Sequence, residues 1–229
     1  MERNGRKYRN ELKYLVDERD LLIIQSKLQD IMLLDKYCKE GFYEIRSVYF
    51  DDIWDTALKE VLLGVSPRSK YRIRIYNASS EFIQLEKKSK IYDMTNKQSC
   101  SLTLKECEEL LKGNYAIFHT ENDFLKKFKI LSFQRQMTPK IIVYYQRKAF
   151  VCKEGNVRIT FDKNISSSTD IEHFFHKNIL LRPILPKGKH ILEVKYDEFL
   201  PKYIKDVIES GKLDRTSYSK YSICRKYSI

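Results

Sequence analysis

Nine residues, SKYRIRIYN from Ser69 to Asn77, constrain the fold of this chain more than any other segment. They are rich in Tyr and Ile and contain neither Gly nor Pro, which predicts a β-strand. Successive side chains of a strand point to opposite faces, so one face is aromatic and aliphatic. The opposite face carries Lys70, Arg72 and Arg74. A row of cations on a well-formed strand needs an anion or carboxylates nearby.

The same one-sided pattern recurs along the chain. Charged side chains share a face in five further predicted strands, namely Arg9, Glu11 and Lys13; Glu86 and Lys88; Arg147; Arg158; and Glu193 and Lys195. For a single strand, the simplest interpretation is a sheet with its apolar face on a core and its charged face in water. The whole set favours another arrangement, because water-facing strands usually mix in Thr, Ser and Gln rather than Arg and Lys.

Hydrophobic periodicity and turn residues predict an α+β chain in which strands dominate. The expected strands are Lys7–Val16, Tyr43–Asp51, Ser69–Asn77, Glu81–Lys90, Ile91–Ser99, Lys140–Cys152, Asn156–Asp162 and His190–Tyr196. The expected helices run from Asp17 to Leu34, around Trp54–Leu63, and over Thr103–Lys112, Asn122–Leu131, Pro201–Ser210 and Ser217–Tyr227. Successive hairpins indicate an antiparallel sheet. We expect residues 1–229 to form a single domain, since no repeat or flexible linker interrupts them.

The amphipathic helices need a partner for their apolar stripes, and the apolar face of the sheet provides one. About eight strands would close into a barrel, with helices packed outside and the charged face lining a tunnel. Two like charges about 6 Å apart repel by roughly 2–3 kcal/mol at an effective dielectric of about 20. Carboxylates or a bound polyanion must therefore compensate. Glu11, Glu86 and Glu193 supply hard oxygen ligands that also suit Mg²⁺ or Mn²⁺.

Composition limits the function without choosing it. The chain has 43 Lys and Arg against 31 Asp and Glu, a formal charge of +12, which favours an anionic partner such as condensed phosphate or nucleic acid. Its 5 cysteines never form CxxC, so a zinc ribbon or a disulfide framework is not expected. His173 and His176 lack partners that would complete a zinc site. Without a signal peptide or an apolar span, a cytoplasmic protein with no membrane span is predicted.

A series of short motifs resembles the VTC domain, the polyphosphate polymerase domain of the vacuolar transporter chaperone complex. The motifs are RxExKY at Arg9–Tyr14, SVYFD at Ser47–Asp51, KYRIRIY at Lys70–Tyr76, LEKKSK at Leu85–Lys90, YYQRKAF at Tyr144–Phe150, VRITFD at Val157–Asp162, ILEVKY at Ile191–Tyr196 and SYSKY at Ser217–Tyr221. That family belongs to the triphosphate tunnel metalloenzymes and is similar in fold to the CYTH phosphatases. The resemblance implies a tunnel barrel that transfers the γ-phosphate of ATP to inorganic polyphosphate with Mn²⁺ or Mg²⁺.

The resemblance also implies roles for individual residues. The expected catalytic cations are Lys13, Arg72, Arg74, Lys88, Arg147 and Lys220. The expected phosphate-binding residues are Arg9, Lys97, Arg158, Lys195 and Ser219, of which Arg158 and Lys195 are added because they share the charged face. Glu193, with Glu11 and Glu86, is expected to hold the metal. The motif SYSKY would lie on a helix that closes one tunnel mouth.

Two positions depart from the family pattern. The tunnel phosphatases begin with ExExK, whereas position 9 is Arg here, which removes one metal carboxylate. Ser217 stands where the eukaryotic polymerase has a lysine. Two alternatives therefore remain close, a triphosphate or polyphosphate hydrolase and a non-catalytic polyphosphate-binding module. A nucleic-acid-binding protein is a more distant alternative that net charge alone would allow, and no nucleic-acid partner is expected.

Overall fold

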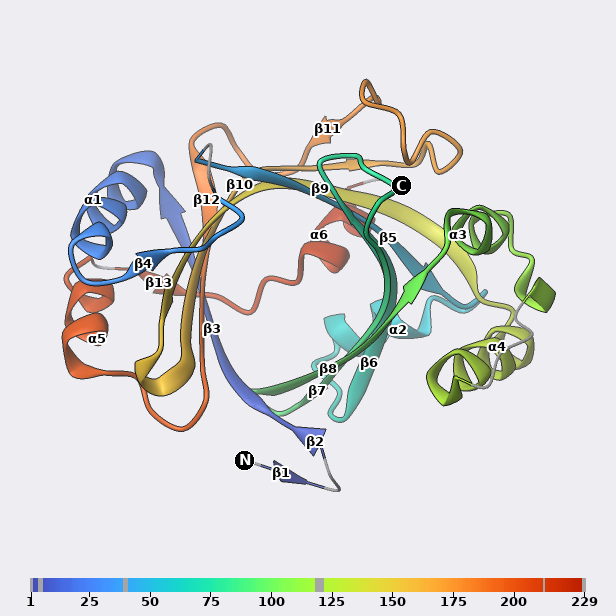
Figure 1. The fold of residues 1–229 in the computed structure, drawn as a ribbon, viewed down its shortest axis with the longest axis horizontal. Coiled ribbons are helices and arrows are strands. Elements are labelled where there is room, and N and C mark those ends of the chain that lie inside the picture. The colour runs from blue at the N-terminus through green and yellow to red at the C-terminus, as the bar shows by residue number, and fades with distance from the viewer. Residues whose placement is uncertain (1, 4–5, 39–40, 118–121, 212, 228–229) are drawn as a thin grey trace.

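Eight antiparallel strands form a ring in the computed structural model, which describes residues 2–3, 6–38, 41–117, 122–211 and 213–227 (Figure 1). The strand order around the ring is β10–β12–β3–β8–β7–β6–β5–β9, and pairing of β9 with β10 closes it. These strands are β3 (Arg9–Asp17), β5 (Tyr43–Asp51), β6 (Arg68–Tyr76), β7 (Ile83–Ile91), β8 (Met94–Leu102), β9 (Thr138–Cys152), β10 (Val157–Ser168) and β12 (Lys189–Tyr196). The predicted closed barrel is confirmed.

Six α-helices and several short strands complete the described part of the chain. The helices are α1 (Glu18–Gln29), α2 (Thr56–Leu62), α3 (Leu104–Leu111), α4 (Asp123–Arg135), α5 (Lys202–Glu209) and α6 (Lys220–Lys226). The short strands are β1 (Glu2–Arg3), β2 (Arg6–Lys7), β4 (Leu33–Leu34), β11 (Arg182–Pro183) and β13 (Asp214–Arg215). None of the helices within these ranges is long and apolar enough to cross a membrane.

Most boundaries follow the sequence signals. The capping box predicted from Thr103 and Glu106 is present at the start of α3. The turn between β9 and β10 uses Gly155 at a φ of 64°, where a Cβ would approach the Phe199 carbonyl oxygen to 2.5 Å. The first helix was expected to reach Leu34, but it ends at Gln29, because the following residues leave it to pair with β9 as β4.

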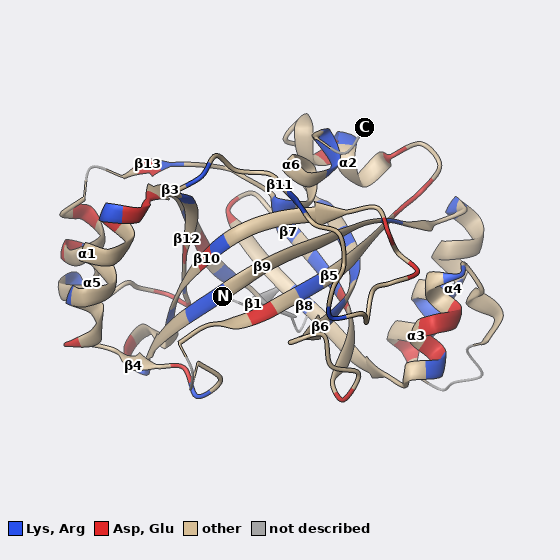
Figure 2. Cartoon of the chain, turned by 90° about the horizontal axis from the view of Figure 1, so that it is seen from above, with Lys and Arg blue, Asp and Glu red and all other residues tan. Residues whose placement is uncertain are grey.

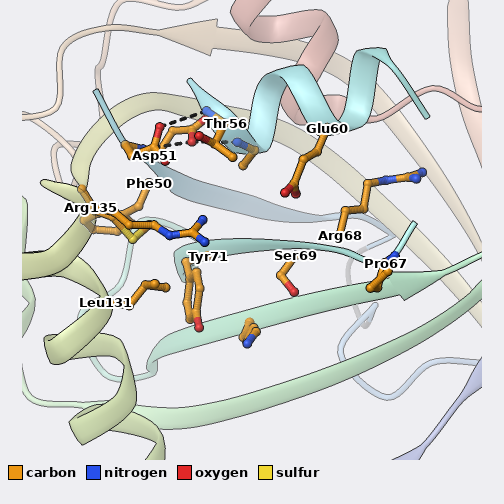
Figure 3. A pocket seen from close by; sticks show the side chains of 14 residues that line it. Phe50, Asp51, Thr56, Glu60, Pro67, Arg68, Ser69, Tyr71, Leu131 and Arg135 are labelled. Atoms are coloured by element: carbon orange, nitrogen blue, oxygen red, sulfur yellow. Dashed lines mark hydrogen bonds between the residues drawn. The ribbon is translucent and has the colours of Figure 1, made fainter. Parts of the chain in front are cut away.

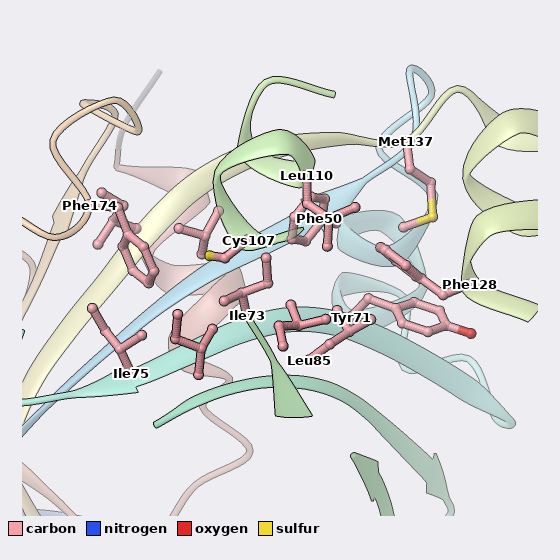
Figure 4. Close-up of a cluster of buried hydrophobic side chains, with 14 of the residues drawn as sticks. Phe50, Tyr71, Ile73, Ile75, Leu85, Cys107, Leu110, Phe128, Met137 and Phe174 are labelled. Carbon is pink, nitrogen blue, oxygen red and sulfur yellow. The ribbon is translucent and has the colours of Figure 1, made fainter. Parts of the chain in front are cut away.

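The outer face of the barrel packs against helices in two clusters. In the first, Ile73 and Leu85 from the sheet meet Leu110 of α3 and Phe128 of α4, all almost fully buried (Figure 4). In the second, α1 and α5 cover β3, β9, β10 and β12. Full burial of one such aliphatic side chain contributes roughly 1.5–3 kcal/mol. These clusters therefore hold the charged face of the strands toward the interior.

The interior itself has two unlike sides. Toward β5 and β9, a third apolar cluster packs Ile45, Val143 and Tyr145 with Tyr221 and Cys224 of α6. Charged side chains line β3, β6, β7 and β12 instead, joined by Arg147 of β9. The interior is thus mainly cationic on one side and apolar on the other, because α6 packs against the apolar side. All five cysteines are free thiols, as predicted.

Helix α6 lies with α2 at one end of the barrel (Figure 2). The Tyr221 hydroxyl donates to the Asp51 carboxylate at 2.6 Å, and its ring stacks on Tyr49 with centroids 4.9 Å apart. This contact joins two of the motifs that resemble the VTC domain. It places Ser219 and Lys220, at the start of the helix, against the charged side of the interior.

Candidate functional site

A small cavity lies inside the barrel, with a volume of about 60 Å³. Its lining comes from six strands and from the start of α6, and consists of Lys13, Tyr49, Lys70, Arg72, Arg74, Lys88, Tyr145, Arg147, Glu193, Lys195, Ser219 and Lys220. Strand register explains the convergence, since residues directly opposite each other in an antiparallel pair share a face. Lys70, Lys88 and Lys97 form one such row across β6, β7 and β8.

Glu86 on β7 organises the first group of cations. Arg72 donates to Oε2 of Glu86 from Nε at 2.7 Å and from Nη2 at 2.6 Å, and Lys97 lies 3.1 Å from Oε1. Nη1 of Arg74 is 3.8 Å from the same carboxylate. Burial would raise the pKa of Glu86, but Arg72, Arg74 and Lys97 outweigh it and hold the pKa far below its usual range. Glu86 is 1% exposed, so it acts as a fixed counter-charge behind the guanidinium groups.

Glu11 on β3 organises the second group. Lys88 donates to both oxygens of Glu11, at 2.9 and 2.6 Å, and Lys13 lies 2.9 Å from Oε1. Burial and the nearby Glu193 charge would raise the pKa of Glu11, yet Lys13 and Lys88 bring it well below its usual value. This carboxylate is ionised at every pH where the protein would work.

Asp162 on β10 and Glu193 on β12 organise the third group. Arg147 donates from Nε to Oδ1 of Asp162 at 2.6 Å and from Nη2 to Oδ2 at 2.8 Å. The ammonium group of Lys220, on α6, lies 2.6 Å from the same Oδ2. Glu193 pairs with Lys195 at 2.7 Å and sits 3.8 Å from Lys220. Asp162 is 0% exposed, so it lies behind the cations rather than on the cavity surface.

The three groups leave the interior with excess positive charge. Nine cations (Lys13, Lys70, Arg72, Arg74, Lys88, Lys97, Arg147, Lys195 and Lys220) face four carboxylates, an excess of five. The cavity has room for a few water molecules. A bulkier anion enters when lysine head groups turn from their carboxylates toward it, while Arg72 and Arg147 keep their paired contacts. Flexible stems make this exchange of counter-charge feasible.

Lys88 gives a pH-dependent prediction for stability. Burial is the largest cause that lowers its pKa, to about 7, although its side chain keeps 25% of its surface exposed to the interior. Above about pH 7 the folded state loses this proton while the unfolded state keeps it. Stability therefore rises with pH between the folded and unfolded pKa values. In metal-free buffer we expect the melting temperature to rise from about pH 7 to about pH 9, and Lys88→Met to flatten the rise. A melting temperature that falls over this range in the wild type would contradict the assignment.

Nine of the predicted site residues line the cavity together, namely Lys13, Arg72, Arg74, Lys88, Arg147, Glu193, Lys195, Ser219 and Lys220. The others lie behind or beyond it. Arg9 pairs with Asp197 at 2.8 Å outside the cavity lining. Arg158 binds Asp35 at 2.5 Å and donates to the Tyr43 hydroxyl at 3.2 Å. The phosphate-binding roles of Arg9 and Arg158 stay predictions that this geometry does not favour.

Several lining residues were not among the predicted site residues. The Tyr49 hydroxyl accepts from Arg72 at 2.7 Å, and the Tyr145 hydroxyl accepts from Arg74 at 3.1 Å. Both tyrosines hold guanidinium groups in place. Lys70 and Asp162 share the charged face by simple alternation, so the pattern that identified Arg72 and Arg158 also contained the signal for them.

The carboxylates of the barrel interior fit a divalent metal that is held together with substrate phosphates. Within the described ranges, no three His, Cys, Asp or Glu side chains gather into a cluster that would hold an ion alone. Glu193 lies opposite Lys13, and Glu11 opposite Lys195, so the two glutamates are diagonal neighbours on adjacent strands. Mg²⁺ is commonly held by one or two carboxylates together with substrate phosphates and water. Glu11 and Glu193 fit an ion of that kind, whereas Glu86 belongs to a different group of cations.

A larger cavity, of about 250 Å³, lies outside the barrel beside α2, β6 and α4 (Figure 3). Its cations Arg68, Lys87 and Arg135 are balanced by Asp51, Asp52 and Glu60. The Asp51 carboxylate already accepts hydrogen bonds from backbone N–H groups of α2 and from the Tyr221 hydroxyl. Size alone would favour this cavity, but the excess of inward-facing cations makes the barrel interior the candidate site.

Solved structures similar to this barrel support the fold. A candidate adenylate cyclase from Bacillus halodurans is 16% identical with a TM-score of 0.53, over 90% of this chain and 88% of that chain. A candidate adenylyl cyclase from Hippeastrum, described as having a dominant triphosphatase activity, is 11% identical with a TM-score of 0.56, over 97% of each chain. None of the curated proteins matches.

The family model of the VTC domain matches residues 8–229. The chain belongs to the VTC domain family. The resemblance inferred from the strand motifs is thereby confirmed.

Proposed function

We propose that this protein is an ATP-dependent polyphosphate polymerase that transfers the γ-phosphate of ATP to a growing polyphosphate chain inside the barrel. One observation carries the proposal: guanidinium and ammonium groups from β3, β6, β7, β9, β12 and α6 surround one cavity. An arginine guanidinium can donate two parallel hydrogen bonds to the oxygens of one phosphate, and lysines add mobile point charges. A linear condensed phosphate would bind cations from all of these elements.

The chemistry is mostly positioning and charge stabilisation, as is general for phosphoryl transfer. Arg72 and Arg74, fixed by Glu86 and the two tyrosines, would bind the non-bridging oxygens of the transferred phosphate. Lys220 and Arg147, backed by Asp162, would bind the neighbouring phosphates. A divalent ion held by Glu11 and Glu193 would neutralise charge on the phosphate oxygens.

Hydrolysis of triphosphate is the second candidate, and a fold neighbour described with triphosphatase activity favours it. The sequence departs from the phosphatase pattern at Arg9, whose side chain pairs with Asp197 rather than adding a carboxylate to the interior. Glu193 is the one carboxylate on the described cavity lining. This scarcity of carboxylates that could orient an attacking water supports transfer over hydrolysis.

The products formed from ATP separate the candidates. Purified protein incubated with ATP and Mn²⁺ or Mg²⁺ is expected to yield ADP and long polyphosphate, seen on a gel that resolves chain length. Free phosphate without chains would establish a hydrolase. If neither product forms and the protein still binds tripolyphosphate, the protein is a polyphosphate-binding module. A Lys220→Met variant is the negative control for the activity measured.

A further inference from the structure

Lys70 differs from the other cations of the barrel interior. Among the described residues, no carboxylate lies within 4 Å of its ammonium group, whereas each of the other eight cations has one at that distance. Its ammonium donates to the Ser219 hydroxyl at 2.8 Å and lies 5.9 Å from the ring centroid of Tyr221. A partly buried ammonium with one neutral partner is incompletely compensated.

The neighbours of Lys70 increase this deficit. Lys13 from β3, Lys88 from β7 and Arg72 from its own strand all act on it as like charges, and Glu11 is the main carboxylate that counters them. From α6, Ser219 and Tyr221 contribute no charge. Burial, followed by these three cations, holds the pKa of Lys70 well below its usual value. The empty interior therefore disfavours the charged form of this lysine.

Ser219 can donate one further hydrogen bond to a ligand beside Lys70. Its hydroxyl oxygen accepts from Lys70 and from the backbone N–H of Ser222 at 3.4 Å. A serine hydroxyl has two acceptor positions and one hydrogen to donate, so its hydrogen is left for another acceptor. Two of the three ammonium hydrogens of Lys70 also have no hydrogen-bond partner among the described residues. Both side chains line the cavity.

We propose that Lys70 and Ser219 form a paired donor site, on the barrel wall and the C-terminal helix, that binds one phosphate group of the condensed-phosphate substrate. This role rests on the proposed function and extends it, because it adds a phosphate site in which the substrate supplies the missing counter-charge. Phosphate binding favours the charged form of Lys70, which promotes proton uptake. The same phosphate bridges β6 and α6. Substrate binding in the tunnel therefore favours packing of α6 against the barrel.

The test is calorimetric titration of the full chain with inorganic tripolyphosphate, in metal-free buffer at fixed ionic strength. Lys70→Met is expected to weaken binding about tenfold or more, since hydrogen bonds to charged groups contribute about 1.5–3 kcal/mol. The matched control is Lys87→Met, which removes the same charge from the neighbouring strand on the outer face, opposite Tyr71. It is expected to keep the dissociation constant within about twofold.

Two further readouts distinguish binding from a structural role. Without ligand, Lys70→Met should melt at or above the wild-type temperature, because it removes a poorly compensated charge. Lys70→Arg should keep most of the affinity but take up fewer protons on binding than the wild type, measured in two buffers of different ionisation enthalpy. Wild-type affinity in Lys70→Met would overturn the role of Lys70 alone. Absence of tripolyphosphate binding in the wild type would overturn the proposed function itself.

Discussion

Arg72→Ala is expected to lower the turnover of ATP into polyphosphate by at least about tenfold, the rate effect of roughly 1.4 kcal/mol. The side chain lines the cavity and holds a fixed orientation, with two N–H groups on Glu86 and a third on the Tyr49 hydroxyl. Such a preoriented guanidinium stabilises charge that develops on the transferred phosphate. Arg72→Lys keeps the charge but loses the planar fork, so an intermediate rate is expected.

The activity of Arg72→Ala must be separated from its stability. Removal of the guanidinium leaves Glu86, which is 1% exposed, with Lys97 and the more distant Arg74. Breaking a buried ion pair in this way costs about 3–5 kcal/mol. The double variant Arg72→Ala/Glu86→Gln should recover much of the stability without recovering turnover. Wild-type turnover in the folded single variant would reject the assignment.

Arg147→Met is expected to lower the free energy of unfolding by about 3–5 kcal/mol. Arg147 makes two short bonds to Asp162, which is 0% exposed and in the variant keeps Lys220 as its one ion-pair partner among the described residues. The Asp162 carboxylate has a lowered pKa in spite of burial, chiefly because of Arg147. The variant therefore leaves a buried, ionised and half-compensated carboxylate.

A double-mutant cycle measures this coupling by urea unfolding at neutral pH. Arg147→Met/Asp162→Asn should recover more than half of the lost stability, since both charges are then removed together. Additive effects of the two single changes would show that Asp162 does not depend on Arg147. A matched control is Arg215→Met on the exposed strand β13, where a surface change is expected to alter stability by less than about 0.5 kcal/mol.

Several strand boundaries were beyond prediction for a clear reason. Strand β10 was expected to end at Asp162 but continues to Ser168, because its serines pair with Tyr144 and neighbouring residues of β9. Serine has weak strand preference on its own, and the pairing partner is more than twenty residues away. The apolar side of the interior was missed for the same reason, since it depends on α6, the last helix of the chain, packing against β5 and β9.

The sequence by itself determined which side chains share a face. Alternation along a strand is a local property, so Arg72, Arg74 and Lys88 were assigned to one surface without any knowledge of the fold. Only the tertiary structure decided how that surface is neutralised. Pairing register and ring closure bring Glu86, Glu11 and Asp162 behind particular cations, and they leave Lys70 beside Ser219 without a carboxylate. These partners come from strands far apart in the chain, and packing of the helices against the outer face sets their distances.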